Sequence, residues 1–385
     1  MGLTGTIWTN PAEYLQKAAG EAPVLFFAPA ALQARARRFL AGFPGLVTYA
    51  VKANPDEEVI QNLAAAGVTG FDVASPEEIG LIRRLVPEAA LHYNNPVRSR
   101  REIAAGVALE VDSWSVDSRS ELAKLAEQVP TTARGTRREI AVRFKLPVGG
   151  AAYDFGAKFG AEAGPAAALL AEVARLGYAP ALTFHPGTQC TDPRAWAAYI
   201  HAAAGIARAA GVRIGRLNVG GGFPSHRRAA EAPDLEAIFA TIATETAAAF
   251  GAEAPALVCE PGRGMVGDAF TLATRVKAVR DDGHVFLNDG IYGALAEAPL
   301  MGLTDRIEVR GPDGRRRTGW PRPREVFGPT CDSVDRLPGS IPLPADIAEG
   351  DHVLFHGMGA YTTVTNTRFN GFGGLLMANV LELTV

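Results

Sequence analysis

Short apolar runs rich in β-branched residues recur through the first two thirds of the chain, and stretches with helical periodicity lie between them. Strands that are apolar along their whole length are typical of parallel sheets buried on both faces. We expect eight such strands, at Leu46–Val51, Gly70–Val73, Ala90–Tyr93, Leu109–Val111, Ile140–Phe144, Ala181–Phe184, Arg216–Val219 and Ala256–Cys259.

The intervening segments have helical patterns, and several begin with a capping residue, such as Ser75 before Pro76. Eight strands that alternate with helices favour an α/β fold built as a (β/α)8 TIM barrel over an open doubly wound sheet. The expected helices are Asp56–Ala66, Pro76–Leu85, Arg98–Ala105, Asp117–Glu127, Glu162–Leu176, Arg194–Ala210 and Asp234–Phe250.

The pattern changes after about Gly267, where Gly, Pro and Asp turns separate the apolar runs and few helical stretches occur. This pattern is typical of an antiparallel β domain. The charged segment Asp313–Arg324 indicates a solvated hairpin tip. We expect the barrel over residues 23–266 and the β domain over residues 1–22 and 267–385. The expected strands of the β domain are Phe270–Val279, His284–Leu287, Arg306–Val309 and His352–His356.

Composition narrows the range of partners. A net charge of -3, without a basic cluster beside aromatic residues, argues against nucleic acid or an anionic membrane as a partner. The longest apolar runs are too short to span a bilayer, and residues 1–14 lack the pattern of a signal peptide. Cys190, Cys259 and Cys331 are widely spaced and odd in number, which indicates a reducing, cytoplasmic compartment and no metal site.

The candidate chemistry lies at the predicted strand ends, because the carboxyl ends of barrel strands face the active site. An amine, an imidazole, several carboxylates and a glycine-rich loop at one barrel mouth are the expected setting for pyridoxal phosphate (PLP). The strand-end residues are Lys52, Asp72, Asn94, Asp112, Arg143, His185, Gly220–Gly222 and Glu260.

Each of these features also has a plainer interpretation. Lys52 can attack a carbonyl from an apolar setting, or it can simply extend to solvent. Gly220–Gly222 can bind an anion or form an ordinary βα turn. Glu260 and Arg263 can serve a cofactor or form a surface ion pair, and His185 can be a core histidine. Their occurrence in this order around one barrel mouth favours the cofactor site.

The sequence motifs are similar to those of the PLP-dependent decarboxylases with the alanine racemase fold (fold type III). The similarity extends over nearly the whole chain and is greatest to the ornithine and lysine decarboxylase branch, whereas diaminopimelate decarboxylases usually carry Cys-Glu-Ser in place of Cys-Asp-Ser. The motifs are YAVKAN at 49–54, FDVAS at 71–75, FHPGTQ at 184–189, GGGFP at 220–224, EPGR at 260–263, NDGIYG at 288–293, GPTCDSVD at 328–335, GAYT at 359–362 and FNGF at 369–372.

The resemblance implies a role for each cofactor-binding residue. Lys52 holds PLP as a Schiff base, His185 stacks on its ring, and Glu260 pairs with the protonated ring nitrogen. The residues implied to shape the Lys52 side of the pocket are Asp72, Glu78 and Arg143. The residues implied to hold the phosphate are Thr188, Gly222, Arg263 and Tyr361, and the further residues implied to bind the cofactor are Gly220, Gly221 and Gly262.

The resemblance also implies a homodimer with shared active sites. Cys331 reaches the partner's site and governs protonation of the carbanion, and Asp332 binds the distal ammonium of the substrate. Lys158 pairs with Asp335 across the dimer. The residues implied to line the substrate pocket are Tyr292 and Phe369.

The implied activity is decarboxylation of L-ornithine to putrescine, a step of polyamine biosynthesis. Decarboxylation of L-lysine or another basic amino acid is the main alternative. A racemase would require a weaker electron sink than a PLP ring whose nitrogen is paired with Glu260. An inactive binding protein would be expected to have lost Lys52 or Cys331, and both are present.

Two departures from the family pattern affect the substrate assignment more than the reaction type. Thr188 stands where the family often has Ser. Leu300 and Met301 stand where ornithine decarboxylases of eukaryotes have a Tyr-Asp pair whose Asp binds the distal amine. Glu297 and Asp305 are the nearby carboxylates that could compensate.

Overall fold

The computed structural model describes residues 6–18, 20–133, 135–147 and 158–384. The chain divides into two compact units. The barrel unit consists of residues 36–224 and 233–265. The sheet unit consists of residues 1–35, 225–232 and 266–385.

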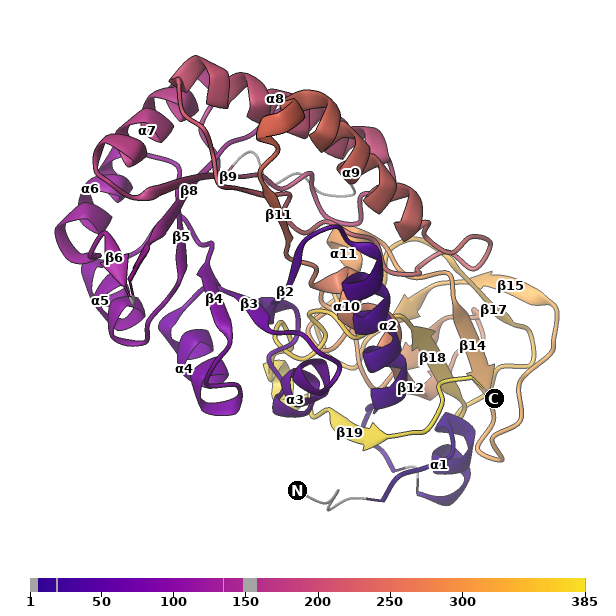
Figure 1. Ribbon diagram of the computed structural model, residues 1–385. Coiled ribbons are helices and arrows are strands. Elements are labelled where there is room, and N and C mark those ends of the chain that lie inside the picture. Colours follow the sequence, from indigo (N-terminus) through magenta and orange to yellow (C-terminus); the bar gives the residue numbers. More distant parts are fainter. Residues whose placement is uncertain (1–5, 19, 134, 148–157, 385) are drawn as a thin grey trace. The chain divides into compact units, whose positions relative to one another are not determined.

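Eight parallel strands close the barrel unit into a ring, in the order β10-β11-β2-β3-β4-β5-β8-β9 (Figure 1). The strands are buried along most of their length, which explains why they are apolar without alternation. The predicted eight-stranded barrel is therefore confirmed. The strands are β2 Leu46–Ala50, β3 Gly70–Val73, β4 Ala90–Tyr93, β5 Ser113–Val116, β8 Glu139–Arg143, β9 Ala179–Thr183, β10 Arg216–Asn218 and β11 Ala256–Cys259.

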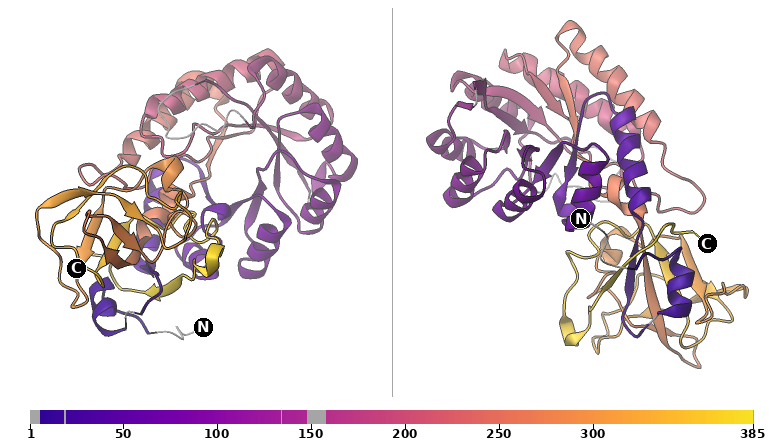
Figure 2. Two further views of the ribbon diagram at one scale, coloured as in Figure 1. Left: turned by 180° about the vertical axis from the view of Figure 1, so that it is seen from behind. Right: turned by 60° about the horizontal axis from the view of Figure 1, so that its bottom comes forward.

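Helices surround the strand ring on its outside (Figure 2). In α4 the predicted cap is present, because Ser75 accepts a hydrogen bond from the Glu78 N–H and Pro76 occupies the first turn. The short hairpin of β6 (Thr132–Ala133) and β7 (Thr136–Arg137) precedes β8. The helices are α3 Glu57–Ala65, α4 Pro76–Leu85, α5 Arg100–Ala108, α6 Arg119–Gln128, α7 Ala163–Arg175, α8 Pro193–Ala210 and α9 Leu235–Phe250.

The strand expected at Leu109–Val111 is wrong. Helix α5 continues to Ala108, and Glu110 then adopts a left-handed conformation with a φ of 54°, which turns the chain before β5 begins at Ser113. Asp112 consequently lies at the amino end of the barrel strands, where its carboxylate accepts the Leu91 N–H at 2.9 Å. It is therefore not a residue of the barrel mouth.

The sheet unit contains a seven-stranded sheet. Five of its strands follow the order β14-β18-β12-β1-β19, β13 also pairs with β12, and β16 pairs with β13. Its strand pairs are antiparallel except for β1 with β19 and β13 with β16. The sheet strands are β1 Val24–Phe27, β12 Phe270–Val279, β13 Val285–Leu287, β14 Ile307–Arg310, β16 Val326–Phe327, β18 His352–His356 and β19 Leu376–Asn379. Shorter elements are α1 Pro11–Lys17, α10 Arg263–Val266, α11 Ala298–Met301, β15 Pro321–Arg324 and β17 Ile341–Pro344.

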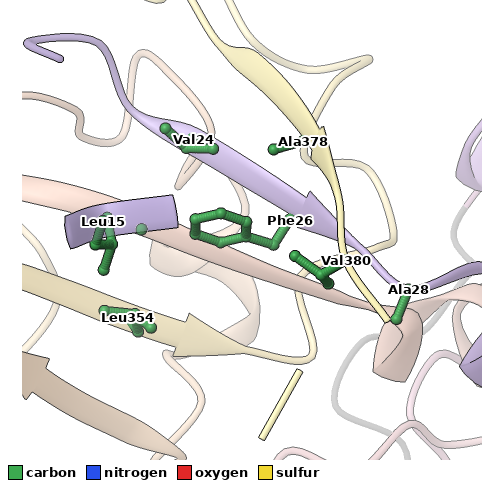
Figure 3. Packing of buried hydrophobic residues seen from close by; sticks show 8 residues of the cluster. Leu15, Val24, Phe26, Ala28, Leu354, Ala378 and Val380 are labelled. Atoms are coloured by element: carbon green, nitrogen blue, oxygen red, sulfur yellow. The ribbon is translucent and has the colours of Figure 1, made fainter. Parts of the chain in front are cut away.

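The core of the sheet unit joins both ends of the chain (Figure 3). Leu15 of α1, Phe26 of β1, Leu354 of β18 and Val380 after β19 pack into one buried cluster. Burial of side chains of this size stabilises the fold by about 1.5–3 kcal/mol each. The N-terminal segment is thus tied to the sheet by its apolar side chains.

Residues 23–35 belong to the sheet unit, although the sequence analysis assigned them to the barrel. The reason is that β1 pairs with β12 and β19, which lie in the last third of the chain. An apolar four-residue run does not reveal such distant partners. Helix α2 (Pro29–Gly42) follows β1, and the division between the units falls within it.

The charged segment Asp313–Arg324 is mostly exposed, and its last residues form β15, which pairs with β17. A solvated loop was predicted here, whereas the short strand was not. Across the described parts of the chain, none of the helices combines the length and the apolar character that crossing a bilayer requires.

Candidate active site

Lys52 lies at the barrel mouth, directly after β2. Tyr49 and Ala50 are buried in the strand, and the 3-10 turn Val51–Ala53 carries Lys52 to an exposed position. The charge of Lys52 acts on Asp72, at the end of the neighbouring strand. A primary amine in this position can reach a bound carbonyl compound.

Two carboxyl groups face Lys52. Burial raises the pKa of Asp72 well above its usual range, the Glu260 carboxylate raises it further, and Lys52 opposes the shift. Oδ1 of Asp72 is buried without a hydrogen-bond partner among the described residues. Burial also raises the pKa of Glu78, whose Oε2 accepts the Ala74 N–H at 2.7 Å. Both carboxyl groups are therefore suited to exchange a proton with the lysine amine.

Glu260 follows β11 and is buried, with 7% of its surface exposed. Its Oε2 accepts two hydrogen bonds, from Nδ2 of Asn94 at 2.6 Å and from Nδ2 of Asn218 at 3.2 Å. Asn94 was expected at the barrel mouth and lies there. Asn218 was missed as a site residue, although an amide that ends a barrel strand just before a glycine-rich loop is a recognisable signal.

His185 packs against the glycine-rich loop. Its Nδ1 accepts the Gly187 N–H at 3.0 Å, and its Nε2 lies 3.1 Å from the position that a Cβ on Gly221 would take. Burial lowers the pKa of His185 well below its usual value, and the charges of Lys52 and Arg143 lower it further. The imidazole is consequently neutral, with its proton on Nε2. Burial also lowers the pKa of Arg143, and nearby carboxylates oppose that shift.

The glycine-rich loop after β10 has no room for side chains. Gly220 and Gly222 have φ values of 73° and 82°. A Cβ on Gly220 would lie 2.1 Å from the Phe184 carbonyl oxygen, and one on Gly222 would lie 2.3 Å from the Gly187 carbonyl oxygen. Only glycine fits both the conformation and the close approach. Such a backbone can present N–H groups to a phosphate.

The other predicted phosphate ligands are distributed over several elements. Thr188 is half-buried in the loop after β9, and Arg263 is buried at the start of α10. A Cβ on Gly262 would lie 2.9 Å from Cβ of Ala53, so the EPGR loop packs against the turn that carries Lys52. Tyr361 belongs to the sheet unit and has a φ of 64°. Its contact with the phosphate remains a prediction.

Replacement of Gly220 tests whether the close backbone contacts of the glycine-rich loop contribute to the stability of the protein. We expect Gly220→Ala to lower the free energy of unfolding by about 3 kcal/mol or more, because both the backbone conformation and a backbone contact oppose the methyl group. Gly211 is a matched control, since its φ is 64° and nothing lies within 4 Å of its Cβ position. Gly211→Ala should cost only about 1–2 kcal/mol. Equal losses in chemical denaturation would contradict this account of the loop.

Cys331 lies in the loop between β16 and β17 and is exposed. Its N–H and its Sγ both contact Oδ1 of Asn370, at 3.2 and 3.3 Å. Asn370 has a φ of 53° and belongs to the 3-10 turn Phe369–Gly371. The side chain of Asn370 thus fixes the position of the Cys331 thiol.

Asp332 follows Cys331 and is held by two donors. The Tyr292 hydroxyl donates to Oδ2 at 2.6 Å, and the Val334 N–H donates to Oδ1 at 3.0 Å. These bonds lower the pKa of Asp332, the Tyr292 bond most strongly. The Tyr292 ring lies 4.7 Å from that of Phe369. The sheet unit therefore brings the four residues predicted for the substrate side into one cluster.

Asp335 has a role within its own unit. It is 2% exposed, and its carboxylate accepts hydrogen bonds from the Ile291 N–H and from both the N–H and the hydroxyl of Thr330. It thereby fixes the conformation of the loop that carries Cys331. Lys158 is exposed in the barrel unit, with Nζ 4.9 Å from the centre of the Phe159 ring. The Lys158–Asp335 pair remains a prediction.

The structure gives no support for a compensating carboxylate at Asp305. Asp305 accepts the Ala229 N–H and lies 3.6 Å from the Arg228 guanidinium, so the segment of residues 225–232 occupies it. Leu300 is 72% exposed, and Glu297 precedes helix α11. The role of Asp332 as the partner of the distal ammonium remains a prediction.

The residues at the barrel mouth fit PLP. The aldehyde of PLP requires a primary amine, which Lys52 provides. Its phosphate requires close backbone approach, which Gly220 and Gly222 permit. Its ring nitrogen requires a carboxylate, and Glu260 is buried within the same barrel mouth. The unpartnered Oδ1 of Asp72 shows that this polar site has further hydrogen-bonding capacity.

An eight-stranded barrel with this lysine at its mouth, together with a mainly antiparallel sheet, defines the class of fold type III PLP enzymes. Residues 30–267 match the model of the family "Pyridoxal-dependent decarboxylase, pyridoxal binding domain". This match spans more than half of the chain, and the protein therefore belongs to the pyridoxal-dependent decarboxylases.

Relatives of known activity agree with this assignment. The chain is 32% identical over 334 residues to a lysine/ornithine decarboxylase of Selenomonas ruminantium, covering 85% of this chain and 81% of the relative. It is 30% identical over 369 residues to the ornithine decarboxylase of Mus musculus, covering 87% of this chain and 75% of the relative.

Solved structures extend the likeness to the fold. The arginine decarboxylase of Paramecium bursaria Chlorella virus bound to agmatine has a TM-score of 0.83 and 25% identity, covering 94% of this chain and 96% of that chain. The lysine/ornithine decarboxylase of Vibrio vulnificus complexed with cadaverine has a TM-score of 0.80 and 25% identity, covering 96% of this chain and 97% of that chain. These relatives share the reaction type and differ in substrate.

Proposed function

We propose that this protein decarboxylates L-ornithine to putrescine. The observation that carries the substrate assignment is the Asp332 carboxylate, held by the Tyr292 hydroxyl at 2.6 Å. A carboxylate beside the rings of Tyr292 and Phe369 suits a distal ammonium group, which both a negative charge and aromatic faces attract. The ornithine and lysine/ornithine decarboxylases among the relatives support the same assignment.

The barrel residues divide the chemistry among them. When bound, PLP supplies an electron-poor ring that accepts the electron pair left when CO2 departs from an amino acid. Glu260 complements the positive ring nitrogen, and His185, neutral and held by the Gly187 N–H, offers a flat face to the ring. Asp72 and Glu78 can take the proton that the Lys52 amine must lose before it attacks a carbonyl.

The sheet unit supplies the groups that act on the substrate. Cys331, fixed by Asn370, carries the proton that the substrate α-carbon receives after decarboxylation. Asp332 sets the distance between the distal ammonium and the reacting carbon. A buried ammonium without a partner is costly, so an amino acid lacking the distal charge should bind poorly.

A substrate panel tests the assignment. Purified protein with PLP should release CO2 fastest from ornithine and next from lysine, compared with arginine, 2,4-diaminobutyrate and diaminopimelate. Identification of putrescine as the product completes the test. If diaminopimelate or a neutral amino acid proved the best substrate, the assignment would be wrong even with fold and cofactor unchanged.

Lysine decarboxylation is the second candidate, and a departure from the family pattern supports it. In the sequence, Leu300 and Met301 stand where ornithine decarboxylases of eukaryotes have the Tyr-Asp pair, and Asp305 is engaged with Ala229 and Arg228. With Asp332 alone at the distal end, one additional methylene is worth only about 1–3 kcal/mol of discrimination. Lysine would then remain a substrate, with a kcat/KM within about 10- to 200-fold of that for ornithine.

We further propose that the active form is a homodimer in which Cys331 and Asp332 complete the site of the partner subunit. Lys52 belongs to the barrel unit, and Cys331 belongs to the sheet unit. A two-fold pairing presents the same two surfaces twice, and it can therefore place one subunit's loop at the other's barrel mouth.

Mixing two inactive variants tests for shared sites. We expect Lys52→Ala and Cys331→Ala each to be inactive, and their mixture to recover up to about a quarter of the wild-type activity. Random exchange makes half of the dimers heterodimers, each with one intact site. Absence of recovery, with subunit exchange demonstrated by tagged pull-down, would show that each site is built within one chain.

The cytoplasm is the compartment that we propose. Cys190 and Cys259 are buried free cysteines, and Cys331 is an exposed free cysteine. A thiol required for proton transfer must stay reduced, and the cytoplasm maintains that state.

A further inference from the structure

Asn94 lies between two buried carboxyl groups. Its Nδ2 donates to Oε2 of Glu260 at 2.6 Å, and its side chain opposes the rise in the pKa of Asp72. Asn94 is 8% exposed, Glu260 7% and Asp72 4%. Two like charges in so dry a place repel each other, and the amide between them offers positive N–H groups to both.

Asn218 reaches the same oxygen from the other side. Its Oδ1 accepts the Gly220 N–H at 2.8 Å, and its Nδ2 donates to Oε2 of Glu260 at 3.2 Å. The backbone N–H fixes the orientation of the amide, because only the amide oxygen can accept this bond. Asn218 therefore joins the first glycine of the phosphate loop to the carboxylate of Glu260.

We propose that Asn94 and Asn218 are positioning residues that hold Oε2 of Glu260 and thereby present its other oxygen, Oε1, to the ring nitrogen of the cofactor. Both amide bonds converge on Oε2. A carboxylate held by one oxygen cannot rotate freely, so its remaining oxygen keeps one direction. The inference rests on the proposed role of Glu260 and assigns two residues to its support.

Asn94 and Asn218, which together form the Glu260 clamp, also affect the charge of the site. Buried carboxyl groups such as Asp72 take up a proton unless donors stabilise the ionised form. The two amides supply donors to Glu260 without adding a negative charge. The carboxylate of Glu260 thus has two N–H donors beside the place proposed for the protonated ring nitrogen.

The test compares PLP with its 1-deaza analogue, in which a CH group replaces the ring nitrogen. The full-length chain, freed of cofactor, is titrated with each compound, and the two dissociation constants are measured by absorbance and fluorescence. The wild type should prefer PLP, because the analogue offers Glu260 no N–H. Asn94→Ala and Asn218→Ala should each reduce this preference about tenfold, the scale of one hydrogen bond to a charged group.

Asn95 provides the matched control. It neighbours Asn94, yet its Nδ2 donates to the Ala74 carbonyl and its Oδ1 accepts the Val97 N–H. Asn95→Ala should retain the full preference for PLP. A clamp variant that also retained it would overturn the inference. If the wild type showed no preference, or Glu260→Gln kept it, the proposed role of Glu260 would fail instead.

Asn94→Asp gives an outcome that lost packing cannot imitate. It keeps the size of the side chain and replaces the donor to Glu260 by a further carboxylate. The preference for PLP should be reduced, and it should stay reduced as the pH rises, because an ionised Asp at position 94 offers Oε2 of Glu260 no donor. Circular dichroism confirms the fold of the variant. A preference for PLP equal to that of the wild type in this variant would contradict the inference.

Discussion

Lys52→Arg is expected to keep a positive charge at the barrel mouth and to abolish the covalent attachment of PLP. A guanidinium has a pKa above about 12 and is not a carbonyl nucleophile. Visible absorbance from bound cofactor should disappear. Loss of a positioned proton-transfer group alone lowers turnover by about 10²- to 10⁴-fold, so activity should fall at least that far. Absorbance spectra and CO2 release measure both effects.

Reductive labelling identifies the attachment site independently of activity. After borohydride treatment of the holoenzyme and peptide mapping, the pyridoxyl label should be found on Lys52. The chain contains six lysines, so the label has few alternative sites. Lys124→Arg is a suitable control, because Lys124 belongs to the barrel unit and pairs with Glu121 at 2.5 Å. Label on another lysine, or full activity in Lys52→Arg, would reject the assignment.

The barrel could be predicted because its signal is local. A parallel strand buried on both faces leaves an unbroken apolar run, and the caps of helices such as α4 lie beside them in sequence. The error at Leu109–Val111 arose because Leu109 and Val111 are apolar for another reason, and Glu110 between them is exposed. Val111 is buried where the chain leaves α5, and the strand proper contains Ser113 and Ser115. An apolar run alone does not distinguish a buried barrel strand from a buried turn after a helix.

The sheet unit shows where local patterns stop being informative. Strand β1 has the same apolar character as a barrel strand, but it pairs with β12 and β19. That choice depends on strands far away in the sequence and on the cluster of Leu15, Phe26 and Val380. A sequence window cannot contain such partners.

The residue types of the site were predictable, whereas the hydrogen bonds that hold these residues in position were not. Lys52, His185 and Glu260 follow strands, so the barrel places them automatically. The two amides on Glu260 and the bond between Asn370 and Cys331 depend on side-chain directions. The sequence analysis included Asn370 only within the FNGF motif and gave it no role of its own. Its left-handed conformation explains why an asparagine stands there.

Asp332→Ala is the change expected to affect substrate choice most. We expect kcat/KM for ornithine to fall about a hundredfold or more, because the substrate ammonium loses its charged partner. PLP affinity should be unchanged, since Asp332 belongs to the sheet unit and its contacts are with Tyr292 and Val334. Steady-state kinetics and cofactor titration separate the two effects.

Graded variants distinguish charge from position. Asp332→Asn keeps the shape of the side chain and removes its charge, so it should lose nearly as much ornithine activity as Asp332→Ala. Tyr292→Phe removes only the hydroxyl that orients Oδ2 and should cost about tenfold or less. Asp281→Ala changes an exposed carboxylate of the same unit and should behave as wild type. If Asp332→Asn kept full ornithine activity, the distal ammonium would have to be recognised by a different group, and the choice of ornithine as substrate would lose its structural basis.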